Sequence, residues 1–161
     1  MIETFRNYKT IFTSKVHHPW DNNIDVNARK SHRDNMGVTP AFMAAKSGSF
    51  EIFRSLAAMG ASIEGQKCSQ GNQLLEPIHI ASKNGHQAIV NLILAKTPDQ
   101  RSLCNEPIES TGSRPLHLAA YGGHLSLCQD LLNFGALFTS QNHYGDTFLH
   151  IAVRHDHQYF V

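Results

Sequence analysis

The sequence predicts an all-α solenoid, in which pairs of short helices stack one unit after another. Two observations carry this prediction. A pattern that opens near proline, fills with alanine and ends at glycine occurs four times, and Pro40, Pro77, Pro115 and Phe148 mark it at spacings of 37, 38 and 33 residues. A second apolar block follows each of the first three copies. Internal periods of this length are typical of repeat proteins, in which each unit buries its apolar face against its neighbours.

The first helix of each unit has local start and stop signals. In the third copy, RPLHLAAYGGH, proline suits the first helical turn, alanine favours the helix interior and glycine favours a left-handed end. Thr39 and Thr147 are expected to cap their helices through the hydroxyl group. Glycines 48, 85 and 123 are expected to turn the chain into the second helix. The predicted inner helices are Thr39–Lys46, Glu76–Lys83, Arg114–Tyr121 and Thr147–Arg154.

The second helix of each unit is predicted from the blocks FEIFRSLAAMGA, QAIVNLILAK and LSLCQDLLNFGA. Within the second block, Ile89, Val90, Ile93 and Leu94 fall on one helical face. Small pairs such as Ala44-Ala45 and Ala119-Ala120 let neighbouring inner helices approach closely. The expected unit is therefore a helix, a tight turn, a second helix and a projecting loop.

These motifs resemble the ankyrin repeat, which has a period of about 33 residues and a T-P-L-H-x-A core. The resemblance covers Asp34 to Val161, with Gly60-Ala61 and Gly135-Ala136 at the ends of second helices. Upstream, Ile24–Ala28 resembles the segment that leads one ankyrin unit into the next. The expected domains are residues 1–33 as an N-terminal helix with a degenerate or capping unit, followed by units 34–66, 71–103, 109–141 and 142–161, the last one truncated.

Several positions depart from the family pattern. Glu76 and Arg114 stand where threonine is expected, so they are placed to pair across the repeat boundary or to point separately into water. The extra residues behind the two long spacings are expected in the loops Ile63–Leu75 and Thr97–Thr111, because insertions in repeat proteins usually lie in projecting loops.

Composition and charge narrow the function classes. An apolar content of 41% with 17% charged residues argues against disorder and against a membrane-spanning chain. A net charge of +1 offers no field that would attract nucleic acid or anionic lipid. No secretory signal opens the sequence, and three cysteines without a C-x-x-C motif suit a reducing compartment. We therefore expect a cytoplasmic protein, monomeric as a segment, with no nucleic-acid or membrane partner.

Histidines and cysteines are the candidates for metal binding and catalysis. His79, His117 and His150 fill the T-P-L-H slot, for which the resemblance implies structural hydrogen bonds, and His86, His124 and His157 fill a slot at the turn. Such residues form a row rather than the cluster that a metal ion needs. Cys128 is expected in the core, whereas Cys68 and Cys104 are expected in loops and accessible. Because no catalytic motif occurs, we expect no metal, no cofactor and no active site in this segment.

The family resemblance implies a module that holds another protein on the concave face of the stack. An alternative is a substrate-targeting segment of a larger enzyme or effector whose catalytic domain lies outside this chain. Tyr121 and Tyr144 are the expected anchors, because tyrosine is common among interface hot spots. The candidate contact residues are Met36, Val38, Lys46, Leu75, Lys83, Asn84, Ser113, Tyr121, Tyr144, Asp146 and Arg154.

Overall fold

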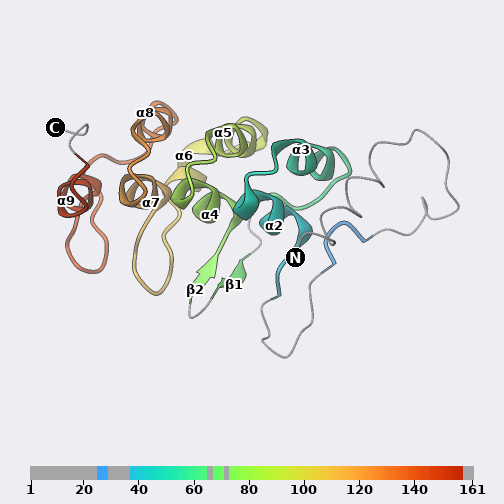
Figure 1. Ribbon diagram of the computed structural model, residues 1–161, viewed down its shortest axis with the longest axis horizontal. Helices are drawn as coiled ribbons and strands as arrows, with labels where there is room; N and C mark the ends of the chain where they lie inside the picture. Colours follow the sequence, from blue (N-terminus) through green and yellow to red (C-terminus); the bar gives the residue numbers. More distant parts are fainter. Residues whose placement is uncertain (1–24, 29–36, 65–66, 71–72, 158–161) are drawn as a thin grey trace, which may run out of the picture.

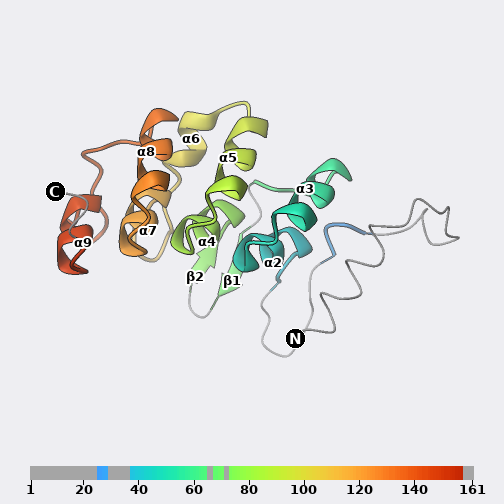
Figure 2. The same ribbon diagram turned by 45° about the horizontal axis from the view of Figure 1, so that its top comes forward.

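The computed structural model describes residues 25–28, 37–64, 67–70 and 73–157, and shows helices in two layers (Figures 1 and 2). The predicted all-α solenoid is confirmed. The helix expected over residues 2–16 lies outside the described residues. The inner layer contains α2 (Pro40–Ser47), α4 (Pro77–Lys83), α7 (Pro115–Tyr121) and α9 (Phe148–Arg154), which pack against one another in that order. The outer layer contains α3 (Phe50–Ala58), α5 (Gln87–Lys96) and α8 (Leu125–Asn133).

The inner helices begin where the sequence predicts. Thr39 caps α2, because its Oγ1 accepts a hydrogen bond of 3.2 Å from the backbone N–H of Phe42. In α9, the backbone N–H of Thr147 donates to Nδ1 of His150 over 3.3 Å, and the threonine hydroxyl lies 2.8 Å from the same nitrogen. These bonds satisfy backbone and side-chain groups at helix starts, where the first N–H groups have no partner within the helix.

The turn between the two helices of a unit depends on glycine. Gly48, Gly85 and Gly123 have φ angles of 73°, 74° and 74°. These angles lie in the left-handed region, which residues with a Cβ rarely adopt. Space matters as well, because a Cβ at Gly48 would lie 2.5 Å from the imidazole ring of His86 in the next unit. Each of these glycines therefore makes room for a neighbouring unit as well as for its own turn.

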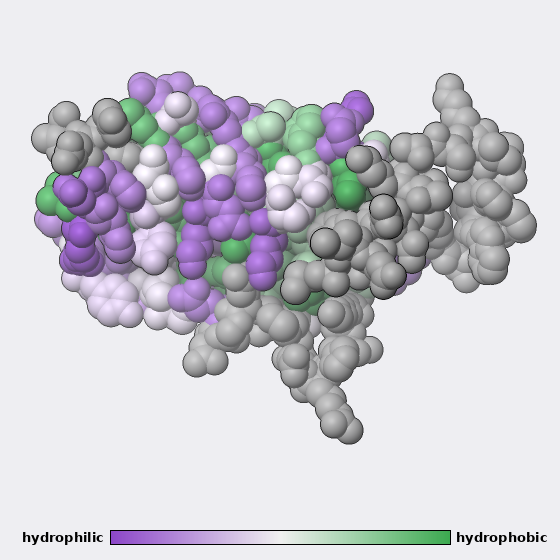
Figure 3. Space-filling view, in the orientation of Figure 1, coloured by the Kyte–Doolittle hydropathy of each residue, from purple (hydrophilic) through white to green (hydrophobic). Residues whose placement is uncertain are grey.

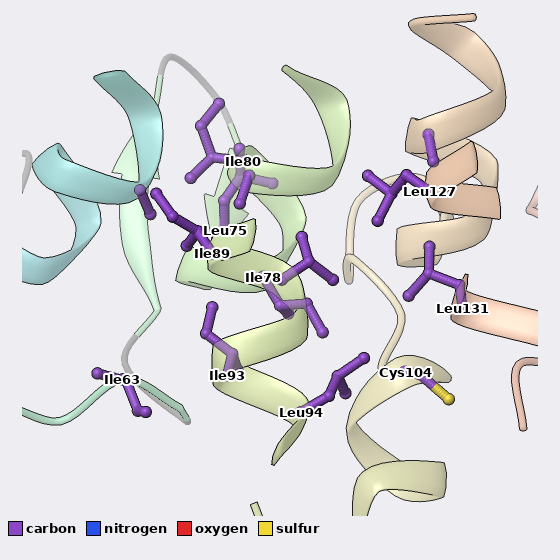
Figure 4. Close-up of a cluster of buried hydrophobic side chains, with 14 of the residues drawn as sticks. Ile63, Leu75, Ile78, Ile80, Ile89, Ile93, Leu94, Cys104, Leu127 and Leu131 are labelled. Atoms are coloured by element: carbon purple, nitrogen blue, oxygen red, sulfur yellow. The ribbon is translucent and has the colours of Figure 1, made fainter. Parts of the chain in front are cut away.

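The core lies between the two layers and continues from unit to unit (Figure 4). Ile78 of α4 and Ile93 of α5 lie in this core together with Leu127 and Leu131 of α8, and each is at most 1% exposed. Cys128 of α8 is 2% exposed, and burial raises the pKa of its thiol to about 12. It is therefore a core residue, as predicted.

The first insertion forms a small antiparallel hairpin of β1 (Cys68–Gln70) and β2 (Gln73–Leu75), in which Cys68 pairs with Leu75. The side chain of Cys68 is 0% exposed and that of Leu75 is 3% exposed. The prediction that Cys68 lies accessible in a loop is wrong, because the hairpin turns this residue and its partner Leu75 toward the core.

The second insertion contains an additional helix, α6 (Gln100–Cys104), which packs beside α5. Asp99 caps it, accepting a hydrogen bond of 2.9 Å from the backbone N–H of Ser102. Cys104 is 0% exposed, so the prediction of an accessible thiol is wrong here too. Burial raises the pKa of this thiol to about 11, because water no longer stabilises the thiolate.

Asparagine side chains tie the junctions to the units that follow. Asn105 Oδ1 accepts a hydrogen bond of 2.8 Å from the backbone N–H of Leu137, just after Gly135-Ala136. Asn27 makes the same contact of 2.8 Å with the backbone N–H of Ser62, just after Gly60-Ala61. The upstream segment 25–28 therefore holds the end of the first unit's second helix in the same way as residues 103–106 hold that of the third unit.

Candidate protein-binding face

The last residues of the inner helices form one row across the stack. Lys46, Lys83, Tyr121 and Arg154 end α2, α4, α7 and α9 or lie one residue from the end, and all four are exposed. We call these four residues the inner-helix row. Because their helices are neighbours, a single extended ligand can contact them in sequence. Hydrophilic residues cover much of the surface over these helices in Figure 3.

Tyr121 is the centre of the row. Its side chain is 48% exposed, and the ring of His155 packs edge-on against it with 4.5 Å between ring centroids. Lys83 Nζ lies 5.5 Å from the centroid of the tyrosine ring, in the range of a cation–π contact. The phenol ring is therefore positioned by two side chains and still presents half of its surface to solvent.

Histidines at the turns anchor the backbone of the row. His86 Nε2 lies 3.2 Å from the carbonyl oxygen of Lys46, and His124 Nε2 lies 3.2 Å from that of Lys83. His157 Nε2 makes the same contact of 3.0 Å with the carbonyl oxygen of Tyr121. Each row residue up to Tyr121 is thus held from the next unit, which fixes the relative positions of the side chains before any ligand binds.

Tyr144 lies on the loop tip before α9 and is 75% exposed. The loop is ordered by Asn142, whose Oδ1 accepts hydrogen bonds of 2.9 Å from the N–H of Tyr144 and 3.0 Å from that of Asp146. The N–H of His143 donates to the carbonyl oxygen of Thr111 in the preceding loop over 2.9 Å. The tip therefore presents Tyr144 from a loop that is fixed to its neighbour.

Arg154 is partly engaged within the protein. Its guanidinium donates two hydrogen bonds to the carboxylate of Asp146, of 2.7 and 2.8 Å, and these bonds lower the pKa of the Asp146 carboxyl. Asp146 is only 7% exposed. This residue acts by holding Arg154 rather than by facing a ligand.

The structure corrects part of the predicted contact set. Val38 and Leu75 are 7% and 3% exposed, so the expectation that they face solvent is wrong for both, as it is for Asp146. In β2 the side chains alternate, so that Leu74 is exposed and Leu75 is buried. Ser113 is half-buried, and Met36 lies outside the described residues. Lys46, Lys83, Asn84, Tyr121, Tyr144 and Arg154 remain exposed.

His155 was missed as a member of this face. The repeat alignment contains the signal for it, because His155 occupies the slot of Asn84 and Gly122, directly after a row residue. Asn84 uses that slot to donate a hydrogen bond of 2.9 Å to the carbonyl oxygen of Lys46.

Two of the three T-P-L-H histidines, His79 and His117, lie inside the fold, whereas His150 is exposed. His79 Nδ1 accepts from the N–H of Glu76 over 3.2 Å, so its Nε2 carries the proton and donates to the carbonyl oxygen of Glu106 over 2.9 Å. His117 bridges Arg114 and Ser140 in the same way, at 3.1 Å on each side. Burial lowers the pKa of both imidazoles. These histidines therefore connect helix starts to the following junction.

Arg114, at the position where threonine is usual, makes hydrogen bonds to backbone carbonyl groups. Its guanidinium donates to the carbonyl oxygen of Asn105 over 3.1 Å and to that of Gln141 over 3.0 Å. Glu76, in the equivalent slot, is 4% exposed. The alternative in which both side chains point into water is wrong, because one is buried and the other bridges two junctions.

Within the described part of the chain, no three histidine, cysteine, aspartate or glutamate side chains gather as metal ligands would. No helix among these residues has the length and apolar character needed to cross a bilayer.

Comparisons with known proteins agree with this architecture. A family model of ankyrin repeats in three copies matches residues 16–104 and 78–161. The chain is 30% identical over 127 residues to mouse Synphilin-1, covering 79% of this chain and 13% of that protein. It is 37% identical over 119 residues to the human transient receptor potential cation channel subfamily A member 1, covering 74% of this chain and 10% of the channel.

A third relative is the phosphocholine transferase AnkX of Legionella pneumophila, 28% identical over 117 residues, which cover 73% of this chain and 12% of that enzyme. The chain thus spans about a tenth of the length of the curated relatives that it matches. The repeated helix pairs, the capped inner helices and the family match lead to one conclusion: the chain belongs to the ankyrin-repeat family, whose repeats form a non-catalytic fold for protein–protein interaction.

Proposed function

We propose that this segment binds its partner protein through the inner-helix row together with the loop tip that carries Tyr144. The observation that carries the proposal is Tyr121. Its ring is half exposed, yet it is positioned by His155 and Lys83, and its backbone is fixed by His157. A large side chain that is ordered before binding loses little conformational entropy on association, which favours its use as an anchor.

A reducing, cytoplasmic setting is part of the same proposal. Cys68, Cys104 and Cys128 are all buried. Burial raises the pKa of Cys104 to about 11 and that of Cys128 to about 12, so both remain protonated at neutral pH. Cys104 and Cys128 therefore serve as small apolar side chains of the core.

The test is partner capture by a pair of matched double variants. Tyr121→Ala with Tyr144→Ala removes the two proposed anchors, and we expect about 30-fold weaker binding or more, because a central anchor typically contributes about 2 kcal/mol. The control is Met59→Ala with Leu125→Ala, which removes two apolar side chains of the outer layer that are 44% and 42% exposed. Both proteins should keep the same helix content and melting temperature.

The hairpin offers the competing site. Leu74 of β2 is 46% exposed, and Leu74→Ser changes this surface without touching the inner-helix row. The partner protein is first captured with the wild-type protein and purified. Its affinity for each variant is then measured by calorimetry. Retention of binding by the tyrosine double variant, with loss in Leu74→Ser, would overturn the proposal and assign binding to the hairpin.

A further inference from the structure

The inner-helix row carries positive charge that the protein itself leaves uncompensated. Lys46 and Lys83 are exposed, and neither makes an ion pair within the described residues. Lys83 contacts the ring of Tyr121 instead. Lys46, Lys83 and Tyr121, on the successive helices α2, α4 and α7, combine positive charge with an aromatic surface.

Most acidic side chains of the described part are engaged away from these lysines. Glu51 pairs with Arg54 on α3 at 2.7 Å, and Glu109 pairs with Lys67 at 2.8 Å beside the hairpin. Asp130 of α8 accepts hydrogen bonds of 2.7 Å from Gln87 and 2.8 Å from Asn91 of α5. At the end of the row near α9, Asp156 is exposed and Asp146 holds Arg154. The uncompensated part of the row therefore runs from Lys46 through Lys83 to Tyr121.

The spacing of this part suits an extended polypeptide. Packed helices lie about 8–10 Å apart, and an extended chain in the polyproline II conformation advances about 3.1 Å per residue with three residues per turn. One step along the row therefore corresponds to about three residues of a bound peptide, and every third side chain of that peptide lies on the same face. A peptide in this conformation that crosses α2, α4 and α7 meets the row with every third side chain.

We propose that the inner-helix row binds an extended acidic segment of the partner, in which two carboxylates three residues apart contact Lys46 and Lys83 and an aromatic side chain three residues further contacts Tyr121. The inference rests on the proposed function and adds the chemical class of the partner. The net charge of only +1 supports a short acidic segment over a long polyanion, because the chain as a whole has little charge to attract a polyanion.

The test uses a fluorescein-labelled peptide with Glu at positions 1 and 4, Phe at position 7 and Ser elsewhere, and a second peptide with the reversed order. The matched control has the same composition with Glu at positions 1 and 3. We expect one of the two orders to bind more tightly than the control, and to shift the amide signals of Lys46, Lys83 and Tyr121 in NMR titrations.

Variants of the protein locate the contacts. Lys46→Gln and Lys83→Gln should each weaken binding about three- to fivefold, the effect of losing one exposed ion pair. Lys96→Gln is the matched control, because Lys96 is an exposed lysine at the end of the outer helix α5. It should leave the affinity unchanged, and added salt should weaken binding of the wild type more than that of Lys83→Gln.

Three results would overturn the proposal. They are equal binding of the control peptide, equal effects of Lys96→Gln and Lys83→Gln, and no amide shifts along the row at about 1 mM peptide, a concentration that detects even binding of about −4 kcal/mol. Failure of the acidic-segment proposal can be told apart from failure of the proposed function. If the partner's binding depends on Tyr121 and Tyr144 while the peptides do not bind, the face is right and the acidic segment is wrong.

Discussion

Two junctions connect neighbouring units in different ways. One lies between the second and third units, and the other lies between the third and fourth units. The longer one buries Cys104 and Ile108, which are 0% and 2% exposed, and folds part of its length into α6. The shorter one leaves Leu137 and Phe138 at 43% and 54% exposure, although Phe138 packs edge-on against Phe148. The added residues have thus become part of the core, whereas the shorter connection stays largely on the surface.

The largest expected difference between the two junctions is in the free energy of unfolding, because the longer junction buries more of its apolar side chains. Ile108→Ala should lower the free energy of unfolding by about 2–5 kcal/mol, because it leaves a cavity in a packed core. Leu137→Ala, the matched change in the short junction, should cost less than about 1 kcal/mol since much of this side chain is already in water. Urea denaturation followed by circular dichroism measures both. A cost below about 1 kcal/mol for Ile108→Ala would mean that the insertion is only loosely attached.

A smaller effect should separate the two asparagines that hold these junctions. Asn105 connects α6 to the end of α8, since Nδ2 donates to Gly135 O over 3.0 Å and Oδ1 accepts from the N–H of Leu137 over 2.8 Å. Among the described residues, the Asn142 side chain bonds only within its own loop. We expect Asn105→Ala to cost about 2 kcal/mol and Asn142→Ala about 1 kcal/mol. Equal losses in denaturation midpoints, at equal m-values, would show that the contact between units adds nothing to the local one.

The smallest effect is shared by both junctions and depends on pH. Burial lowers the pKa of His79, which bonds to the longer junction, and of His117, which bonds to the shorter one and lies near Arg114. Because the unfolded chain binds protons more readily, stability is fully present above about pH 6.5 and falls below it. At pH 6 the loss should stay below about 1 kcal/mol per histidine. NMR should show both rings titrating at lower pH than an unperturbed histidine, and an unchanged urea midpoint between pH 8 and pH 6 would contradict this coupling.

The parts of the fold that depend on local signals could be predicted from the sequence. Pro77, Ala81 and Gly85 mark a helix and its turn within ten residues, and the structure places α4 there. The T-P-L-H pattern also identified His79 as a hydrogen-bonding residue. Such signals act through backbone conformation, which does not require knowledge of distant contacts.

The remaining features depend on contacts between segments far apart in the chain. Cys68 is buried because β1 pairs with β2 and packs on the body, and the sequence of the insertion contains no apolar periodicity to indicate this. Asp146 is half of an ion pair with Arg154, which lies eight residues later at the other end of α9. Within the candidate face, the exposed residues at helix ends followed from the repeat, whereas the inward loop residues Val38 and Leu75 did not.

The contact between each turn glycine and the next imidazole has a consequence for how such a chain changes in evolution. Gly48 receives His86, Gly85 receives His124, and Gly123 receives His157, so every complementary pair is split between two consecutive units. A unit duplicated whole brings one histidine for the preceding copy and one glycine for the following copy. Gain or loss of an internal unit therefore preserves all these contacts without a compensating substitution. Loop length does not enter the pairing, so the junctions are free to lengthen while the register of the stack stays the same.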